Sequence, residues 1–392
     1  METLPPDLRR RFLIPLWPRD RAVAACVCPE WRDMVATMPP LMELELPLAI
    51  EDDVAEGDNG VSCYLKGGGM NINAMLLVAV MPNDAGICVW DAITANVLRI
   101  LPHTTPIPWY ASHCEFLTPQ TLFVMAPDLY RVIDVRTGDI TRDAMLVTDL
   151  GRAICVSARP DCDGTWLAIM HEADQVAVYQ LHDTDDGEEA IPPRYELLLH
   201  VTEEDMPPQR STHSSTLHYS PDGEKLAVAL DYDDSSTLHV WQIEENYHFE
   251  SFHEITRHLV IGDVSADVMH LVWSVDSRFV ALSSASNTTL KVCDTLPDSP
   301  LPEGFSIDFP QGEEYTRWIA WGVSDEDPAL HLLLAVYDSG HVVRHSIRVD
   351  GAHVHTTSRV LARHRTAGFA RFVLGSHHVL VASLREAFFV CD

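Results

Sequence analysis

The sequence predicts a mainly β protein, in which a seven-bladed β-propeller follows a small module of three helices. Two observations carry this prediction. A strand-like pattern recurs seven times between residues 87 and 392, at spacings near the length of one propeller blade. By contrast, residues 1–40 place their apolar side chains at helical spacing. We therefore divide the chain into a helical module at 1–40 and a propeller at 41–392.

The composition is that of an ordinary globular chain, with 46% apolar and 22% charged residues among 392. Its 58 acidic and 27 basic side chains give a formal net charge of −31. Nucleic acids and anionic membranes are bound mainly through Lys and Arg, so this balance argues against both as main partners. No apolar run reaches the roughly 20 residues that a membrane helix needs. The proline- and arginine-rich start is unlike a signal peptide.

Nine cysteines are scattered along the chain without a regular spacing. An odd number of irregularly placed cysteines is typical of reduced thiols rather than of a disulfide framework. We therefore expect the protein in the cytoplasm, with the nucleus as an alternative location.

Three short helices are expected in the first forty residues. In the first, Leu8 and Phe12 are four residues apart and share a face, and Pro15 ends the helix. The second covers about 20–27, and the third begins at Pro29. Three helices of this size enclose a very small core, so their apolar faces need a partner.

The stretch contains Leu4-Pro5, a helix with Leu8 and Phe12, Leu16 before the charged pair Arg19-Asp20, and then Val27-Cys28-x-x-Trp31. The order Leu-Pro, helix, leucine before a charged pair, and Val-Cys-x-x-Trp resembles an F-box, and Arg21 stands where that family commonly has leucine. The resemblance implies docking to the small Skp-type adaptor of cullin–RING ubiquitin ligases, and the alternative is a helical cap packed on the propeller. The residues that the resemblance assigns to adaptor binding are Leu4, Pro5, Leu8, Phe12, Leu13, Leu16, Val27, Cys28 and Trp31.

The remainder of the chain repeats an apolar strand that ends in an aromatic, Cys or other residue before a polar one. Successive repeats are 43 to 62 residues apart, and we assign each of them to the third strand of a four-stranded blade. The long spacing contains an acidic, proline-flanked stretch at 183–193, which predicts a surface insertion. The equivalent positions are Trp90, Ile133, Tyr179, Trp241, Cys293, His345 and Cys391.

Hairpin signals accompany these strands. Strands are expected at 76–80, 225–230 and 332–336, each beside a turn rich in Gly, Asp or Asn. The turn Ser220-Pro221-Asp222-Gly223 and the Trp90-Asp91 ending are similar to those of WD repeats. The resemblance covers about 41–392 with degenerate repeats, and it implies a propeller that binds other proteins.

The ends of the chain suggest how the ring closes. The last repeat stops at Asp392, directly after a third strand, whereas a blade needs four strands. Residues 42–48 alternate between apolar and polar side chains, as an edge strand does. We therefore expect segment 41–50 to supply the outer strand of the last blade, beside 386–392.

No catalytic, metal-binding or cofactor-binding pattern accompanies this framework. The 20 histidines lack zinc-ligand spacing, and His353 and His355 share a strand face without a Cys or carboxylate cluster. The glycines at 67–69 are not followed by the Lys-Ser/Thr of a phosphate loop, and no serine lies in a nucleophile elbow. We expect a protein that is not an enzyme, without cofactor or metal, and a propeller hydrolase is the least favoured alternative.

Acidic runs at 51–53, 203–205, 231–234 and 325–327 are expected in loops. They are either solvated loops or a negative surface that attracts a client protein with a basic segment. The expected function is a substrate-recognition subunit of an SCF-type ubiquitin ligase, and the alternative is an interaction scaffold without a ubiquitin role. The residues that bind the client are unknown. Candidates on the face around the central channel are five basic residues expected at the entries to the first strands: His113, Arg152, His213, Arg317 and Arg365.

Overall fold

A computed structural model describes twenty-seven strands with their adjoining turns, and every regular element in this part of the chain is a strand. The helices expected in 1–40, the strand expected at 42–48 and the insertion expected at 183–193 all lie outside the described residues. The described residues are 69–71, 76–80, 87–91, 97–101, 113–117, 121–126, 129–145, 153–159, 166–171, 175–180, 195–199, 215–232, 235–245, 253–262, 268–284, 288–309, 314–324, 327, 329–363, 369–372, 378–382 and 387–391.

The described strands form seven antiparallel sheets, in which neighbours in sequence are neighbours in space. Six sheets have four strands and the last has three. The first three sheets are β1 (Gly69–Asn71), β2 (Leu76–Val80), β3 (Ile87–Asp91) and β4 (Val97–Leu101); β5 (His113–Phe116), β6 (Thr121–Ala126), β7 (Leu129–Asp134) and β8 (Ile140–Met145); and β9 (Ala153–Ala158), β10 (Trp166–His171), β11 (Gln175–Gln180) and β12 (Tyr195–Leu199). The other four are β13 (Ser215–Tyr219), β14 (Lys225–Tyr232), β15 (Ser235–Glu245) and β16 (His253–Ile261); β17 (Val268–Trp273), β18 (Phe279–Ser284), β19 (Leu290–Asp294) and β20 (Phe305–Ile307); β21 (Thr316–Val323), β22 (Leu330–Tyr337), β23 (His341–Asp350) and β24 (His353–Arg363); and β25 (Phe369–Phe372), β26 (His378–Ala382) and β27 (Ala387–Cys391).

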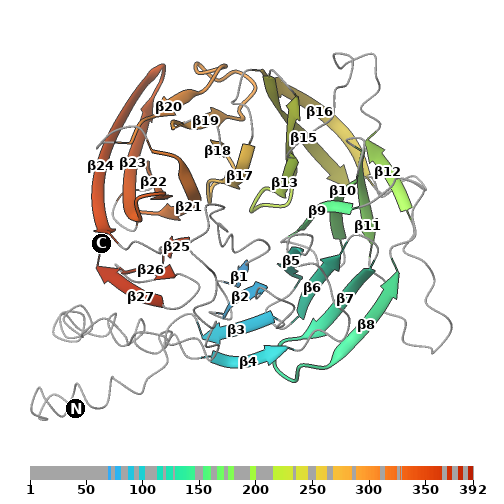
Figure 1. Ribbon diagram of the computed structural model, residues 1–392. Coiled ribbons are helices and arrows are strands. Elements are labelled where there is room, and N and C mark those ends of the chain that lie inside the picture. The colour runs from blue at the N-terminus through green and yellow to red at the C-terminus, as the bar shows by residue number, and fades with distance from the viewer. Residues whose placement is uncertain are drawn as a thin grey trace, which may run out of the picture.

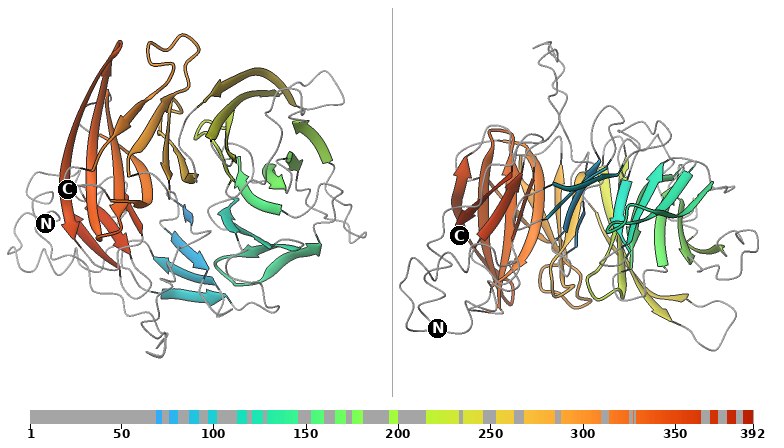
Figure 2. Two further views of the ribbon diagram at one scale, coloured as in Figure 1. Left: turned by 45° about the horizontal axis from the view of Figure 1, so that its top comes forward. Right: turned by 90° about the horizontal axis from the view of Figure 1, so that it is seen from below.

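The sheets are arranged around a common centre (Figure 1). The first strand of each sheet lies nearest the centre and the last strand lies at the rim. Seen from the side, the strands run through the thickness of the ring (Figure 2). This arrangement leaves the turns between strands on the two flat faces of the ring.

All seven repeated positions of the sequence fall on the third strand of a sheet, namely β3, β7, β11, β15, β19, β23 and β27. The strands expected at 76–80, 225–230 and 332–336 are confirmed as β2 and as parts of β14 and β22. The acidic run at 231–234 was expected in a loop, but Asp231 and Tyr232 extend β14 and pair with Ser236 and Ser235 of β15. The hairpin is longer than expected because these residues continue the ladder.

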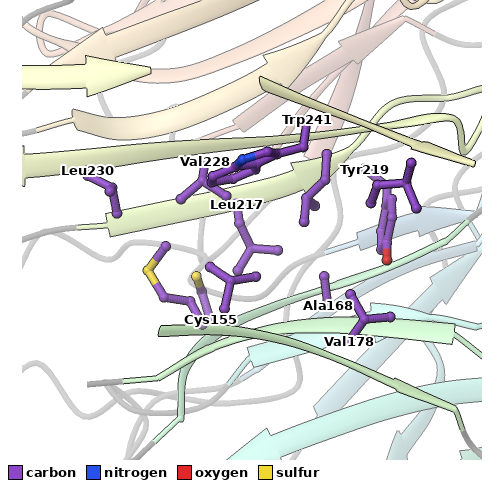
Figure 3. Packing of buried hydrophobic residues seen from close by; sticks show 12 residues of the cluster. Cys155, Ala168, Val178, Leu217, Tyr219, Val228, Leu230 and Trp241 are labelled. Atoms are coloured by element: carbon purple, nitrogen blue, oxygen red, sulfur yellow. The ribbon is translucent and has the colours of Figure 1, made fainter. Parts of the chain in front are cut away.

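Neighbouring sheets pack face to face through strands that are buried on both sides. In β10, Ala168 and Met170 contact the next sheet, whereas Leu167 and Ile169 contact the preceding one. This follows from the alternation of side chains along a strand. Figure 3 shows Leu217, Val228 and Trp241 of the next sheet facing Cys155, Ala168 and Val178.

Side-chain hydrogen bonds also join the innermost strands. The indole N–H of Trp273 donates to the carbonyl of His218 at 2.9 Å, from β17 to β13. The indole N–H of Trp321 donates to the carbonyl of Val272 at 3.0 Å, from β21 to β17. Buried indole N–H groups need such partners, and here the partners fix one sheet against the next.

Candidate functional site

The residues assigned to adaptor binding, from Leu4 to Trp31, lie outside the described residues. Among the five basic residues expected at the beginning of innermost strands, Arg152, His213 and Arg365 also lie outside them. His113 is the first residue of β5, and Arg317 is the second residue of β21. Of the five candidates, Arg317 is therefore the one whose side-chain contacts the structure describes.

Arg317 meets a turn of its own sheet. Its Nε donates a hydrogen bond to Oδ1 of Asp338 at 2.6 Å, and Asp338 lies in the turn between β22 and β23. The backbone N–H of Asp338 donates to the carbonyl of Tyr315 at 3.0 Å. Tyr315 is 46% exposed, and the side chains of Arg317 and Asp338 are 36% and 47% exposed. We call these three residues the Arg317 surface.

The neighbouring sheet holds the backbone beneath this surface. Nε2 of His270, on β17, lies 2.6 Å from the carbonyl oxygen of Arg317 and donates to it. The ring of His270 also lies 5.1 Å from that of Trp318, the next residue of β21. The position of Arg317 is thus fixed by contacts from two sheets.

A buried aromatic pair supports the turn that carries Asp338. The rings of Phe309 and Tyr337 are 4.2 Å apart, and both residues are almost fully buried. Burial raises the pKa of Tyr337, and the nearby charges of Asp308 and Glu314 raise it further. The phenol therefore stays neutral and hydrogen-bonding at physiological pH.

The Arg317 surface is suited to recognition rather than to bond chemistry. Tyrosine and arginine are enriched among the residues that dominate protein–protein binding energy. The ion pair between Arg317 and Asp338 is exposed, so it adds little to stability and leaves both groups accessible to a partner. The opposite charges of Arg317 and Asp338, which lie close together, also favour a partner that carries both charges.

A serine and a histidine lie within hydrogen-bond distance on the outer strands of the same sheet. Nδ1 of His345 is 2.8 Å from Oγ of Ser358, and Nε2 of His345 is 3.1 Å from the hydroxyl of Tyr337. Burial lowers the pKa of His345 to about 4. A histidine with so low a pKa is a weak general base, so we assign this chain of hydrogen bonds a structural role.

Two buried cysteines, Cys155 and Cys293, are poor nucleophiles. Burial raises the pKa of Cys155 and of Cys293 to about 12, so both are protonated thiols at neutral pH. Within the described residues, no group of three or more His, Cys, Asp or Glu side chains gathers as metal ligands would. No described helix is long and apolar enough to span a membrane.

The sequence pointed to Arg317 but not to its neighbours. Asp338 belongs to the turn at 337–340, which was recognised only as a turn. Tyr315 directly precedes β21 and has no local pattern that distinguishes it. Packing of the β22–β23 turn against the start of β21 brings Asp338 close to Tyr315 and Arg317. A local sequence pattern cannot predict a contact between segments that are distant in sequence.

Comparison with solved structures shows what the chain is similar to. The β-propeller domain of Swd1 (Cps50) from Myceliophteria thermophila has a TM-score of 0.56 at 12% identity, covering 83% of this chain and 96% of that one. A chain of the mitotic checkpoint complex has a TM-score of 0.54 at 12% identity, with 90% and 94% covered. KlAtg21, solved in complex with the coiled coil of AgAtg16, has a TM-score of 0.53 at 13% identity, with 82% and 92% covered.

The fold is a β-propeller. At this level of identity the similarity establishes the fold alone. Comparisons with models of protein families and with curated proteins gave no match. The propeller interpretation of the repeat is therefore confirmed by structure.

Proposed function

We propose that the propeller is a protein-interaction domain and that the Arg317 surface is one of its contact sites. The observation that carries this proposal is the exposed Tyr315 beside the Arg317–Asp338 pair, at a place where His270 of the neighbouring sheet binds the backbone carbonyl of Arg317. Rigid aromatic and arginine side chains bind with little loss of conformational entropy. Two of the similar structures come from protein complexes, the mitotic checkpoint complex and the complex of KlAtg21 with the coiled coil of AgAtg16, which supports this class of function.

The contact site is tested by affinity purification of the full chain and of two variants. Tyr315→Ala should lose a client that the unchanged chain retains, because a truncated aromatic anchor costs about 2 kcal/mol or more. The matched control is Ile140→Ala, which removes another exposed apolar side chain from a different sheet. Equal recovery of every partner by all three proteins would remove the Arg317 surface from the proposal.

For the whole chain, we propose a substrate receptor of a cullin–RING ubiquitin ligase. The F-box-like residues from Leu4 to Trp31 would bind the Skp-type adaptor, and a closed seven-bladed propeller would hold a client with a basic segment. The acidic balance of 58 to 27 supports such a client. Tethering raises the local concentration of the client near the transferring enzyme, so this chain needs no catalytic residue, cofactor or metal. Its site of action would be the cytoplasm, with the nucleus as an alternative.

The ubiquitin role is tested by coprecipitation with a Skp-type adaptor. We expect capture by the full chain, and loss of capture on deletion of 1–40 or in the double variant Leu8→Ala/Trp31→Ala. Circular dichroism of the double variant must show the same helical signal as the unchanged chain, because Trp31→Ala could unfold the small module. Capture that survives both changes would leave the alternative, an interaction scaffold without a ubiquitin role.

A further inference from the structure

The outer hairpin of the β21–β24 sheet is basic in an otherwise acidic protein. Its strands β23 and β24 span residues 341–363, which contain four arginines, four histidines and one aspartate. The chain as a whole has 58 acidic and 27 basic side chains. Figure 1 places β24 at the outer rim of the ring, away from the centre.

Register places five of these eight basic residues on one face of the hairpin, namely Arg344, Arg348, His353, His355 and Arg359. Arg344 pairs with Arg359, and Arg348 pairs with His355. Residues directly opposite in an antiparallel pair point to the same side, and positions two apart do so too. The other face carries Val343 and Ile347, which pack into the core shared with the preceding sheet, and the buried His345 between them. One face of the hairpin is therefore largely apolar, and the other carries five basic residues together with Asp350, which pairs with His353.

The basic face is exposed along β24. His353, His355, Thr357 and Arg359 are all exposed, and so is Arg348 on β23, which also forms an ion pair with Asp327. We call Arg348, His353, His355 and Arg359 the basic hairpin surface.

β24 also offers a sheet edge. Among the described strands it is the last in the order of its sheet, and it is eleven residues long. An edge strand presents backbone N–H and C=O groups that an extended chain can pair with. In such a pairing, alternate side chains of the added strand lie beside alternate side chains of β24.

We propose that the basic hairpin surface binds an acidic, extended segment of a partner protein, which adds to β24 as a further strand. Backbone pairing along β24 would supply affinity, and acidic side chains at every second position would lie beside His355 and Arg359. This site is separate from the Arg317 surface, and the inference does not depend on a ubiquitin role.

Other anionic ligands fit this surface less well. Nucleic acid and anionic membranes extend beyond the hairpin and would be repelled by the acidic remainder of the chain, whereas a short acidic segment contacts the hairpin alone. Membrane binding also needs apolar side chains that insert into the lipid. The exposed large apolar residues of the described part are Ile140, Val260, Val275, Leu296 and Tyr315, and none belongs to this hairpin.

The test is fluorescence anisotropy with the full chain and a fluorescein-labelled peptide of about eight residues, a length that spans most of an edge strand. Glutamate and threonine alternate in the probe. A second peptide has the same composition with the glutamates in one block, and a third is N-methylated at alternate amides, which blocks backbone pairing. Arg359→Glu reverses one charge of the surface, and Arg136→Glu makes the same change at an exposed turn between β7 and β8.

We expect the alternating peptide to bind, with about tenfold weaker binding by Arg359→Glu and unchanged binding by Arg136→Glu. The block and N-methylated peptides should bind more weakly than the alternating one. The melting temperature of Arg359→Glu should equal or exceed that of the unchanged protein, because the substitution places opposite charges across from each other at Arg344.

Three results would overturn the proposal. The first is absence of binding, or equal binding by Arg359→Glu. The second is equal binding of all three peptides, which would indicate attraction by charge alone. The third is capture of phosphatidylserine vesicles through Arg359 without capture of the alternating peptide, which would make the surface a lipid site.

Discussion

His345 is a buried histidine held between two hydroxyl groups, those of Tyr337 and Ser358. Burial lowers its pKa from 6.5 to about 4. The ring is therefore neutral in the folded protein under conditions in which the unfolded chain would already carry a proton there. Between these two pH values, the unfolded state binds more protons than the folded state, so acid favours unfolding.

We predict that this one residue makes stability depend on pH. Its contribution is fully present above about pH 6.5 and is lost as the pH falls towards 4, by roughly 3 kcal/mol at most. Urea unfolding between these pH values should show a shallower pH dependence in His345→Gln than in the unchanged protein. Parallel curves for the two proteins would show that His345 does not titrate in this way.

At the scale of one element, two turns show how one backbone shape is made from two sequences. The turn 220–225 between β13 and β14 has Gly223 at φ 72°, and the turn 274–279 between β17 and β18 has Ser277 at φ 58°. In both, the first serine donates to an aspartate two residues later and accepts from a backbone N–H five residues later. A positive φ is favourable for glycine and strained for serine.

A contact between two sheets explains why position 277 is a serine despite its positive φ. Oγ of Ser277 accepts from the backbone N–H of Asp222 at 3.1 Å. Ser277→Gly relieves backbone strain and loses this hydrogen bond, so we expect a change in unfolding free energy near zero. Ser277→Ala loses the bond and keeps the strain, and should destabilise by about 1 kcal/mol. Denaturant titration of both variants checks the order, and a more stable Ala variant would contradict it.

Gly322 marks a close approach between two sheets. A Cβ at this position would overlap the ring of Phe372, which β25 brings against β21. We predict that Gly322→Ala lowers the unfolding free energy by about 1–3 kcal/mol, because the overlap forces backbone or side-chain shifts. Thermal unfolding of Gly322→Ala/Phe372→Leu should show partial recovery, because the smaller side chain leaves room. A double variant that is as unstable as the sum of the single changes would rule out the clash.

The elements that could be predicted from sequence are those that local patterns define. Third strands such as β7, which ends at Asp134 before a turn, combine a core-facing run with a polar end, so both burial and the following turn leave a local signal. The shared strand face of His353 and His355 was likewise correct, because side chains alternate along any strand. The basic hairpin surface was not found, because it also requires the register that sets His355 opposite Arg348. Tyr315 and Asp338 could not be predicted from sequence for the same reason, because packing between distant segments brings them together.

At the scale of the whole molecule, the sheet β25–β27 differs from the other six described sheets because it has three strands. β27 is its outermost described strand, and the figures show the sheet beside β1–β4, where the first and last parts of the described chain meet (Figures 1 and 2). The proposed closing strand at 42–48 lies outside the described residues, so ring closure stays a prediction.

Closure by this segment can be tested through stability, because an unpaired edge leaves backbone groups without ladder partners and the last sheet without part of its cover. Deletion of 41–50 should lower the melting temperature by roughly 5 °C or more. A matched control is deletion of the equally long stretch 183–192 within the expected surface insertion, which should change the melting temperature little.

Point variants make the test more specific. Leu46→Asp places a charge at an apolar position of the alternating segment and should destabilise the protein, whereas Glu45→Gln at a polar position should not. A strand that closes the ring cannot accept a charge on its core-facing side without loss of stability. If Leu46→Asp has no effect, or if the two deletions lower the melting temperature equally, the segment is therefore not the strand that closes the ring.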